Sequence, residues 1–151
     1  MPHHDHRDHV DPADAELAAL LAEVTGPDGE FGHRQHIHLA FVAVRRYGMP
    51  EATTRICDWI QRIAAYARAP QKYHYTVSRA WVEMVAHHVE ADPDGDDFGT
   101  FAARYPMLLD KRLLSRHYRS STLAAPTARQ GWVAPDLQPF PWSPGRDSRT
   151  G

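Results

Sequence analysis

The sequence has almost no cysteine. Among its 151 residues Cys57 is the single one, which excludes an intrachain disulfide and a cysteine-based zinc cluster. Any metal ion would have to be held by histidine, carboxylate or water. Cys57 lies among apolar neighbours in TTRICDWIQRI, which favours a small buried side chain over a catalytic thiolate.

Long apolar runs and an excess of one charge are also missing. No segment approaches the roughly 18 apolar residues of a membrane-spanning helix, and the first ten residues are polar where a signal peptide would be apolar. The formal net charge of -2 gives no general attraction to nucleic acid or to an anionic membrane. We therefore expect a cytoplasmic protein of bacterial type whose partner is a small molecule. Formation of a homodimer stays an open alternative.

The polar and apolar alternation of β-strands is absent over any useful length, and no hairpin or internal repeat is visible. Apolar residues recur instead at helical spacing, with proline and glycine at helix ends. The pattern predicts helices over residues 12–24, 33–47, 51–68, 71–90, 97–104, 107–116 and 125–132. We expect an all-α fold, a compact single-domain bundle of about six helices.

The chain has the length of one domain, which we place at residues 11–141. Residues 1–10 form a His-rich tail expected to be flexible, and residues 142–151 are expected to be disordered. The C-terminal part, APDLQPFPWSPGRDSRTG, is rich in proline and cannot continue a helix. Its apolar Leu137, Phe140 and Trp142 favour an extended arm laid over the helical body.

Histidine is what the sequence has in abundance, with eleven residues. Four of them lie in the N-terminal tail, at His3, His4, His6 and His9. An unstructured tail binds divalent metals without forming a catalytic site, so we look for function among the other histidines.

Two histidines stand one turn apart at the start of a predicted helix, in FGHRQHIHLAF. His33 and His36 begin an apolar face, with Cβ atoms about 5–6 Å apart, near enough to share one metal ion. The positive end of the helix dipole disfavours imidazolium there, which suits a neutral, ligand-competent ring. The alternative is that both residues cap the helix or form local hydrogen bonds. His38 lies on a different face of the predicted helix.

A third histidine begins another apolar face, in QKYHYTVSRAW. His74 shares that face with Trp81 and is flanked by Tyr73 and Thr76. If the two helix starts converge, His74 is the third metal ligand. Helical spacing shows which side chains share a face, but it does not show which faces meet.

Other candidates follow further along the chain. Glu83 is either a carboxylate ligand or base, or a surface glutamate. His88, near the end of the same helix, is expected to be partly exposed or hydrogen-bonded, and His87 to be solvated. His117, in KRLLSRHYRSS, is a candidate fourth ligand or proton-transfer group.

The segment around His117 is basic. Lys111, Arg112, Arg116 and Arg119 would attract a carboxylate or phosphate, or else form a solvated helix face.

The motifs F-x-H-x-x-H, Y-H-x-T and P-D-L-x-P-x-P resemble a group of small bacterial all-helical proteins of obscure function. The resemblance covers about residues 30–141 and implies a shared fold and a shared site, with no established reaction. The residues it touches are Phe31, His33, His36, Tyr73, His74, Thr76, Trp81, His117 and Tyr118. One departure is Tyr75, which stands where many relatives are expected to have glutamate. A carboxylate that serves their chemistry would be lost here.

These patterns predict a small metal-dependent enzyme, of the kind found in specialised metabolism. The predicted mononuclear site is held by His33, His36 and His74, and water takes an open fourth position, as catalytic sites require. Zinc, copper, iron and nickel all accept imidazole, so the ligands do not choose among these divalent ions.

The remaining site predictions concern proton transfer and substrate contacts. The predicted proton-transfer residues are Tyr73, Thr76 and His117. The predicted substrate contacts are Trp81, Arg112, Arg116 and Tyr118. Two alternatives stay open: a non-catalytic helical ligand-binding or accessory protein whose histidines are structural, and a metal-handling protein with the tail as collector.

Overall fold

The structure is a computed structural model that describes residues 12–27, 29–92 and 97–142. The described residues form helices and connecting segments and contain no β-strand, which confirms the predicted all-α fold. The predicted His-rich tail over 1–10, and residues 143–151 of the predicted C-terminal tail, lie outside the described residues. Within the described ranges no helix is both long and apolar enough to cross a membrane.

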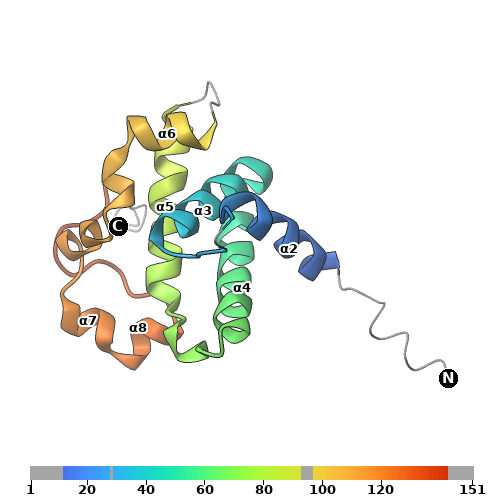
Figure 1. The fold of residues 1–151 in the computed structure, drawn as a ribbon. Coiled ribbons are helices and arrows are strands. Elements are labelled where there is room, and N and C mark those ends of the chain that lie inside the picture. Colours follow the sequence, from blue (N-terminus) through green and yellow to red (C-terminus); the bar gives the residue numbers. More distant parts are fainter. Residues whose placement is uncertain (1–11, 28, 93–96, 143–151) are drawn as a thin grey trace.

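Four long helices form the body of the protein (Figure 1). They are α2 (Pro12–Val24), α3 (His33–Tyr47), α4 (Glu51–Tyr66) and α5 (Tyr75–Glu90). Helix α3 packs against the other three, and α4 also packs against α5. The shorter helices are η2 (Pro70–Lys72), α6 (Phe98–Arg104), η3 (Pro106–Leu109), η4 (Lys111–Arg116), α7 (Ser120–Ala124) and α8 (Pro126–Gln130).

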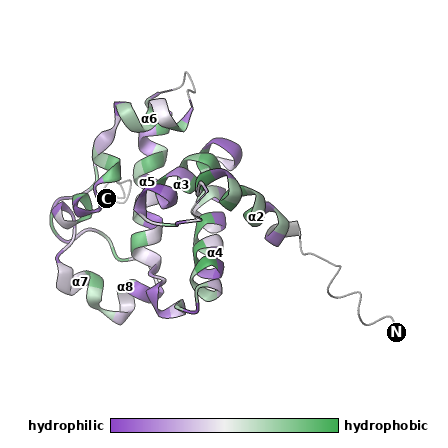
Figure 2. Ribbon diagram, viewed as in Figure 1, coloured by the Kyte–Doolittle hydropathy of each residue, from purple (hydrophilic) through white to green (hydrophobic). Residues whose placement is uncertain are grey.

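Helix α3 is the central helix of the core. Ile37 and Ala40, on its predicted apolar face, are fully buried. Leu39 and Ala43, which lie off that face, are also fully buried because neighbouring helices cover α3 on more than one side. Figure 2 shows the resulting concentration of hydrophobic residues where α2 and α3 meet.

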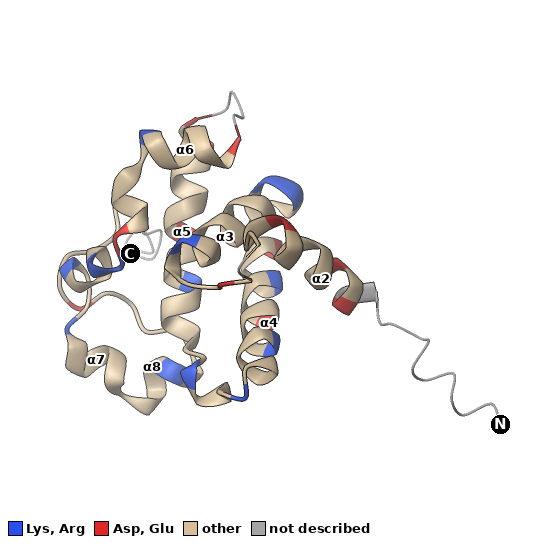
Figure 3. Cartoon of the chain, in the orientation of Figure 1, with Lys and Arg blue, Asp and Glu red and all other residues tan. Residues whose placement is uncertain are grey.

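Helix α4 shows the amphipathic pattern that the sequence predicted. Ile56 and Trp59 are buried, and Ile60 and Ile63 are partly buried against the same core. Its polar face carries Arg55 and other charged residues that pair with carboxylates of α4 and α2. Charged residues recur along α2 and α4 (Figure 3). One face of α4 is therefore buried, and its opposite face forms ion pairs.

Helix α5 begins at Tyr75, four residues later than predicted. The ring of His74 caps the helix, since its Nδ1 accepts a hydrogen bond from the Val77 amide at 3.2 Å. The predicted helix over 107–116 is instead two 3₁₀ segments. They meet at Asp110, whose carboxylate accepts a hydrogen bond from the Arg112 amide at 3.0 Å and starts the second segment. Helix α7 was not predicted.

Residues 131–142 cross α5 as the extended arm that the proline-rich sequence predicted. The Thr76 hydroxyl donates to the Gly131 carbonyl at 2.7 Å and accepts from the Val133 amide at 3.1 Å. The Tyr118 hydroxyl donates to the Val133 carbonyl at 2.6 Å. Further along, Phe140 is 1% exposed. Side-chain hydrogen bonds and one buried ring therefore hold the arm on the body.

Thr76→Val should destabilise the protein by about 2 kcal/mol, because the hydroxyl is buried and its loss leaves two backbone groups of the arm without a partner. Urea unfolding measures the change. Thr127→Val is the matched control, since Thr127 is an exposed residue of α8. Equal stabilities of the two variants would contradict this role of Thr76.

Candidate functional site

His33 lies at the start of α3 and contacts two distant segments. Its Nε2 is 2.9 Å from the carbonyl oxygen of Leu108, and its ring meets the edge of the Trp81 ring at a centroid distance of 4.5 Å. A carbonyl oxygen can only accept, so Nε2 carries the proton. When the ring is neutral, Nδ1 is therefore the nitrogen with a free lone pair.

His36 lies one turn further along α3. Its Nε2 is buried and has no hydrogen-bond partner. Burial, with a smaller contribution from the neighbouring charge of His33, lowers the pKa of His36 to about 4. Burial also lowers the pKa of His33. Both rings are therefore neutral at pH 7, in agreement with the neutral state expected at this helix start.

His74 is not placed with this pair as a ligand set. Its Nδ1 accepts from the Val77 amide, and its Nε2 donates to the Leu123 carbonyl at 2.6 Å, so both ring nitrogens bind backbone groups. In the part of the chain that the structure describes, no three His, Cys, Asp or Glu residues are grouped so that they could hold a metal ion. The metal requirement itself stays a prediction.

The predicted proton-transfer residues have contacts of their own within the protein. Thr76 holds the arm, as described above. His117 is 8% exposed, and its Nδ1 donates to the Gln138 carbonyl at 2.7 Å while its ring packs on Phe140. The Tyr73 hydroxyl is buried without a hydrogen-bond partner, and burial raises its pKa above the usual value. Two of these three residues thus contact the arm.

Two of the predicted substrate contacts lie in the core, and the other two are exposed. Trp81 and Tyr118 are core residues, 2% and 1% exposed. The Arg112 guanidinium pairs with the carboxylate of Asp110, and Arg116 is exposed. None of the four residues lines the cleft described next.

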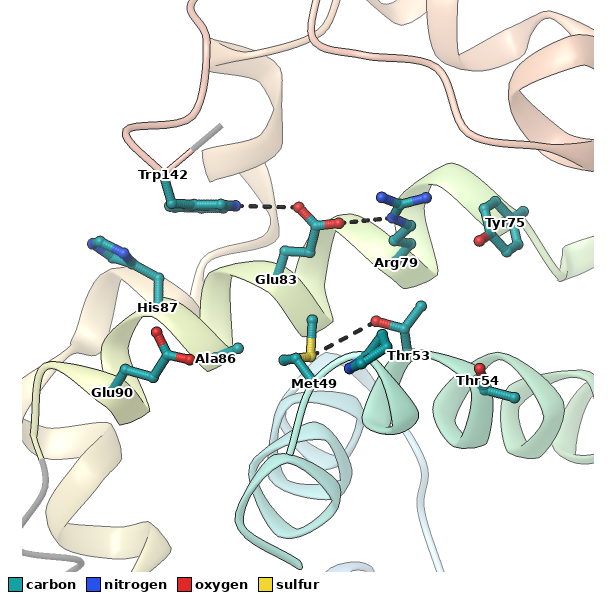
Figure 4. Close-up of a pocket in the computed structure, with 11 residues that line it drawn as sticks. Met49, Thr53, Thr54, Tyr75, Arg79, Glu83, Ala86, His87, Glu90 and Trp142 are labelled. Carbon is teal, nitrogen blue, oxygen red and sulfur yellow. Dashed lines mark hydrogen bonds and ion pairs between the residues drawn. The ribbon is translucent and has the colours of Figure 1, made fainter. Parts of the chain in front are cut away.

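A cleft of about 540 Å³ lies instead between the start of α4 and the outer face of α5 (Figure 4). Three parts of the chain supply its walls: the turn before α4 with the first turn of that helix, one face of α5, and the end of the arm. The lining residues are Met49, Pro50, Thr53, Thr54, Tyr75, Arg79, Glu83, Ala86, His87, Glu90 and Trp142.

The Glu83 carboxylate is the polar centre of this cleft. One oxygen, Oε2, accepts from Arg79 Nε at 2.7 Å, and the other, Oε1, accepts from the Trp142 indole N–H at 3.1 Å (Figure 4). The Glu83 side chain is only 15% exposed. The guanidinium of Arg79 also lies 4.2 Å above the Trp132 ring. These charge-assisted contacts hold the carboxylate in one orientation.

Trp142 lies between two other rings. The Phe140 ring stacks on it at 4.7 Å with an interplanar angle of 6°, and the His87 ring stacks at 4.9 Å with an angle of 28°. His87 is therefore half-buried and not solvated as predicted. Trp142, which the sequence analysis placed at the start of a disordered tail, belongs to the folded arm.

Glu83 is a candidate ligand or base from the sequence, but the cleft around it was not predicted. Arg79 and Glu83 have the i, i+4 spacing of a helical ion pair, which by itself is typical of an exposed helix face. Nothing local in the sequence indicates that Trp142, 59 residues away, would complete the pair.

Comparisons of the chain with protein-family models, with curated proteins and with solved structures gave no match. The resemblance to small bacterial all-helical proteins stays a prediction.

We expect the free energy of unfolding to fall as the pH is lowered from 7 towards 4. The unfolded chain protonates His36 near pH 6.5, whereas the folded protein protonates it only near pH 4, so protons favour the unfolded chain between these values. The contribution of His36 is on the order of 3 kcal/mol.

Urea unfolding of the wild type and of His36→Gln across this range tests the expectation. Carboxylates begin to titrate near pH 4, so the difference between the two proteins is the quantity to compare. The variant should lose less stability on acidification than the wild type. Parallel stability curves would show that His36 is not protonated on unfolding.

Proposed function

We propose that this protein is a small-molecule binding protein whose ligand occupies the cleft between α4, α5 and Trp142. One observation carries the proposal. Arg79 and Glu83 of α5 form an ion pair, and Trp142 of the arm, 59 residues after Glu83, joins it by a direct hydrogen bond at the wall of a cleft. Its volume of about 540 Å³ lies within the range of roughly 300–1,000 Å³ that is usual for ligand pockets.

The walls of the cleft favour a ligand with an apolar body and one polar group. Met49, Pro50 and Ala86 supply apolar contacts along one part of the lining. The side chains of Thr53 and Thr54 add hydroxyl groups at the start of α4 (Figure 4). Such a mixture suits a single ring or a short alkyl chain that ends in a hydrogen-bonding group.

The charges of the lining favour a neutral or cationic ligand over an anion. Arg79 and Glu83 neutralise each other, and Glu90 then leaves one negative charge when His87 is uncharged. The partial positive charge at the start of α4 opposes this only weakly, because the amides of Ala52 and Thr53 already bind backbone carbonyls. A small amine is therefore the best-matched ligand class.

Metal-dependent catalysis is the second candidate function. It is supported by the neutral pair of His33 and His36, which keeps nitrogen lone pairs free for a metal ion. The metal-handling alternative depends on the tail histidines, which lie outside the described residues.

Benzylamine, benzyl alcohol and benzoate test the cleft because they share one ring and differ in charge. We expect benzylamine to bind best and benzoate worst. Trp142 reports on the cleft directly, so the resonance of its indole N–H in ¹H–¹⁵N spectra should shift on titration. Glu90→Gln should weaken benzylamine binding by about threefold, as expected for one partly screened charge.

One blocking variant and two control variants complete this experiment. Thr54→Phe should block the cleft, whereas Thr127→Phe places the same ring on an exposed residue of α8 outside it. Glu30→Gln removes one exposed charge that does not line the cleft. Binding that survives Thr54→Phe, or no shift of the Trp142 resonance with any of the three probes, would refute the proposed site.

A further inference from the structure

The pair of His33 and His36 is a feature of a different part of the molecule, and nothing about it depends on the cleft. Both side chains project from the first turn of α3, three residues apart, which places them on one side of the helix. The two imidazoles are therefore close neighbours in space as well as in sequence.

His33 is held in the way that metal-ligating histidines are commonly held. Its Nε2–H donates to the carbonyl of Leu108, and the ring edge is fixed against Trp81. A hydrogen bond of this kind sets the tautomer and the orientation of the ring, and it leaves the lone pair of the other nitrogen free. The nitrogen available for an ion is then Nδ1 of His33.

His36 provides the second, independent observation. Its Nε2 is buried and has no partner in the protein. Buried polar nitrogens are nearly always hydrogen-bonded, because leaving one unpaired is costly. The residue as a whole is only partly buried. The unpaired nitrogen indicates a partner from outside the chain.

We propose that His33 and His36 together bind one late first-row transition-metal ion, such as Zn²⁺ or Cu²⁺, with solvent completing its coordination. Imidazole suits these ions, and two neutral rings present lone pairs without the loss of a proton. Asp110 and Lys111, the charged groups near His33, have opposite signs and largely offset each other. His74 is not part of this site, since its ring nitrogens bind the backbone.

Zn²⁺ titration of the full chain tests the proposal once the tail histidines are removed as competitors. The starting protein carries glutamine at positions 3, 4, 6 and 9, and calorimetry measures the stoichiometry and affinity. We expect one equivalent of Zn²⁺. His33→Gln and His36→Gln should each weaken binding more than tenfold, because loss of a ligand costs more than loss of a supporting hydrogen bond.

His88→Gln is the matched control. His88 is also half-buried on a long helix, but its Nδ1 donates to the Met84 carbonyl within α5, so its loss should leave Zn²⁺ binding unchanged. No saturable binding by the starting protein would overturn the proposal. So would equal affinities of the His33→Gln, His36→Gln and His88→Gln variants.

A measurement without ring substitutions keeps the test valid if a variant fails to fold. In long-range ¹H–¹⁵N spectra of the starting protein, Zn²⁺ should shift Nδ1 of His33 and Nε2 of His36, and leave the His74 nitrogens in place. Shifts confined to other histidines would overturn the assignment. The benzylamine experiment reports on Trp142, so failure of the cleft and failure of the histidine pair remain distinguishable.

Discussion

The double hydrogen bond of the Thr76 hydroxyl is the interaction on which the candidate cleft depends. It joins α5 to both Gly131 and Val133, where the arm begins its path across the helix. Phe140 then anchors the far end of the arm by burial. Beyond Phe140, the arm brings the Trp142 indole N–H to the Glu83 carboxylate. A site built on a proline-rich segment, which has no helical hydrogen bonds of its own, needs such side-chain anchors.

Helix α5 serves the core and the cleft with different faces. Trp81, Met84 and Val85 point into the core and are at most 2% exposed. Arg79 and Glu83 lie on the outer face and line the cleft. Because the same backbone carries both sets, packing of the inner face fixes the position of the outer one. This rigidity preorganises the Glu83 carboxylate, which lowers the cost of ordering a binding site when a ligand arrives.

The helices were predictable because their signals are local. Gly48, whose φ is 70°, ends α3, as expected for a glycine just after a helix. Ile56 and Trp59, which recur at helical spacing in α4, are buried in the core. His74 shows the limit of such reasoning. Its position at a helix start was correctly recognised, but the contact of its second nitrogen with the Leu123 carbonyl, 49 residues away, became visible only in the structure.

The sequence by itself determined the all-α class, most helix positions, the extended arm and the neutral state expected of the His33 and His36 rings. These features depend on spacing, backbone preference and helix dipole, which act over a few residues. Only the tertiary structure decided that His74 lies apart from that pair as a helix cap and that Trp142 meets Glu83 in a cleft. Contacts of this kind depend on which helix faces meet, and that choice is made by the packing of the whole core.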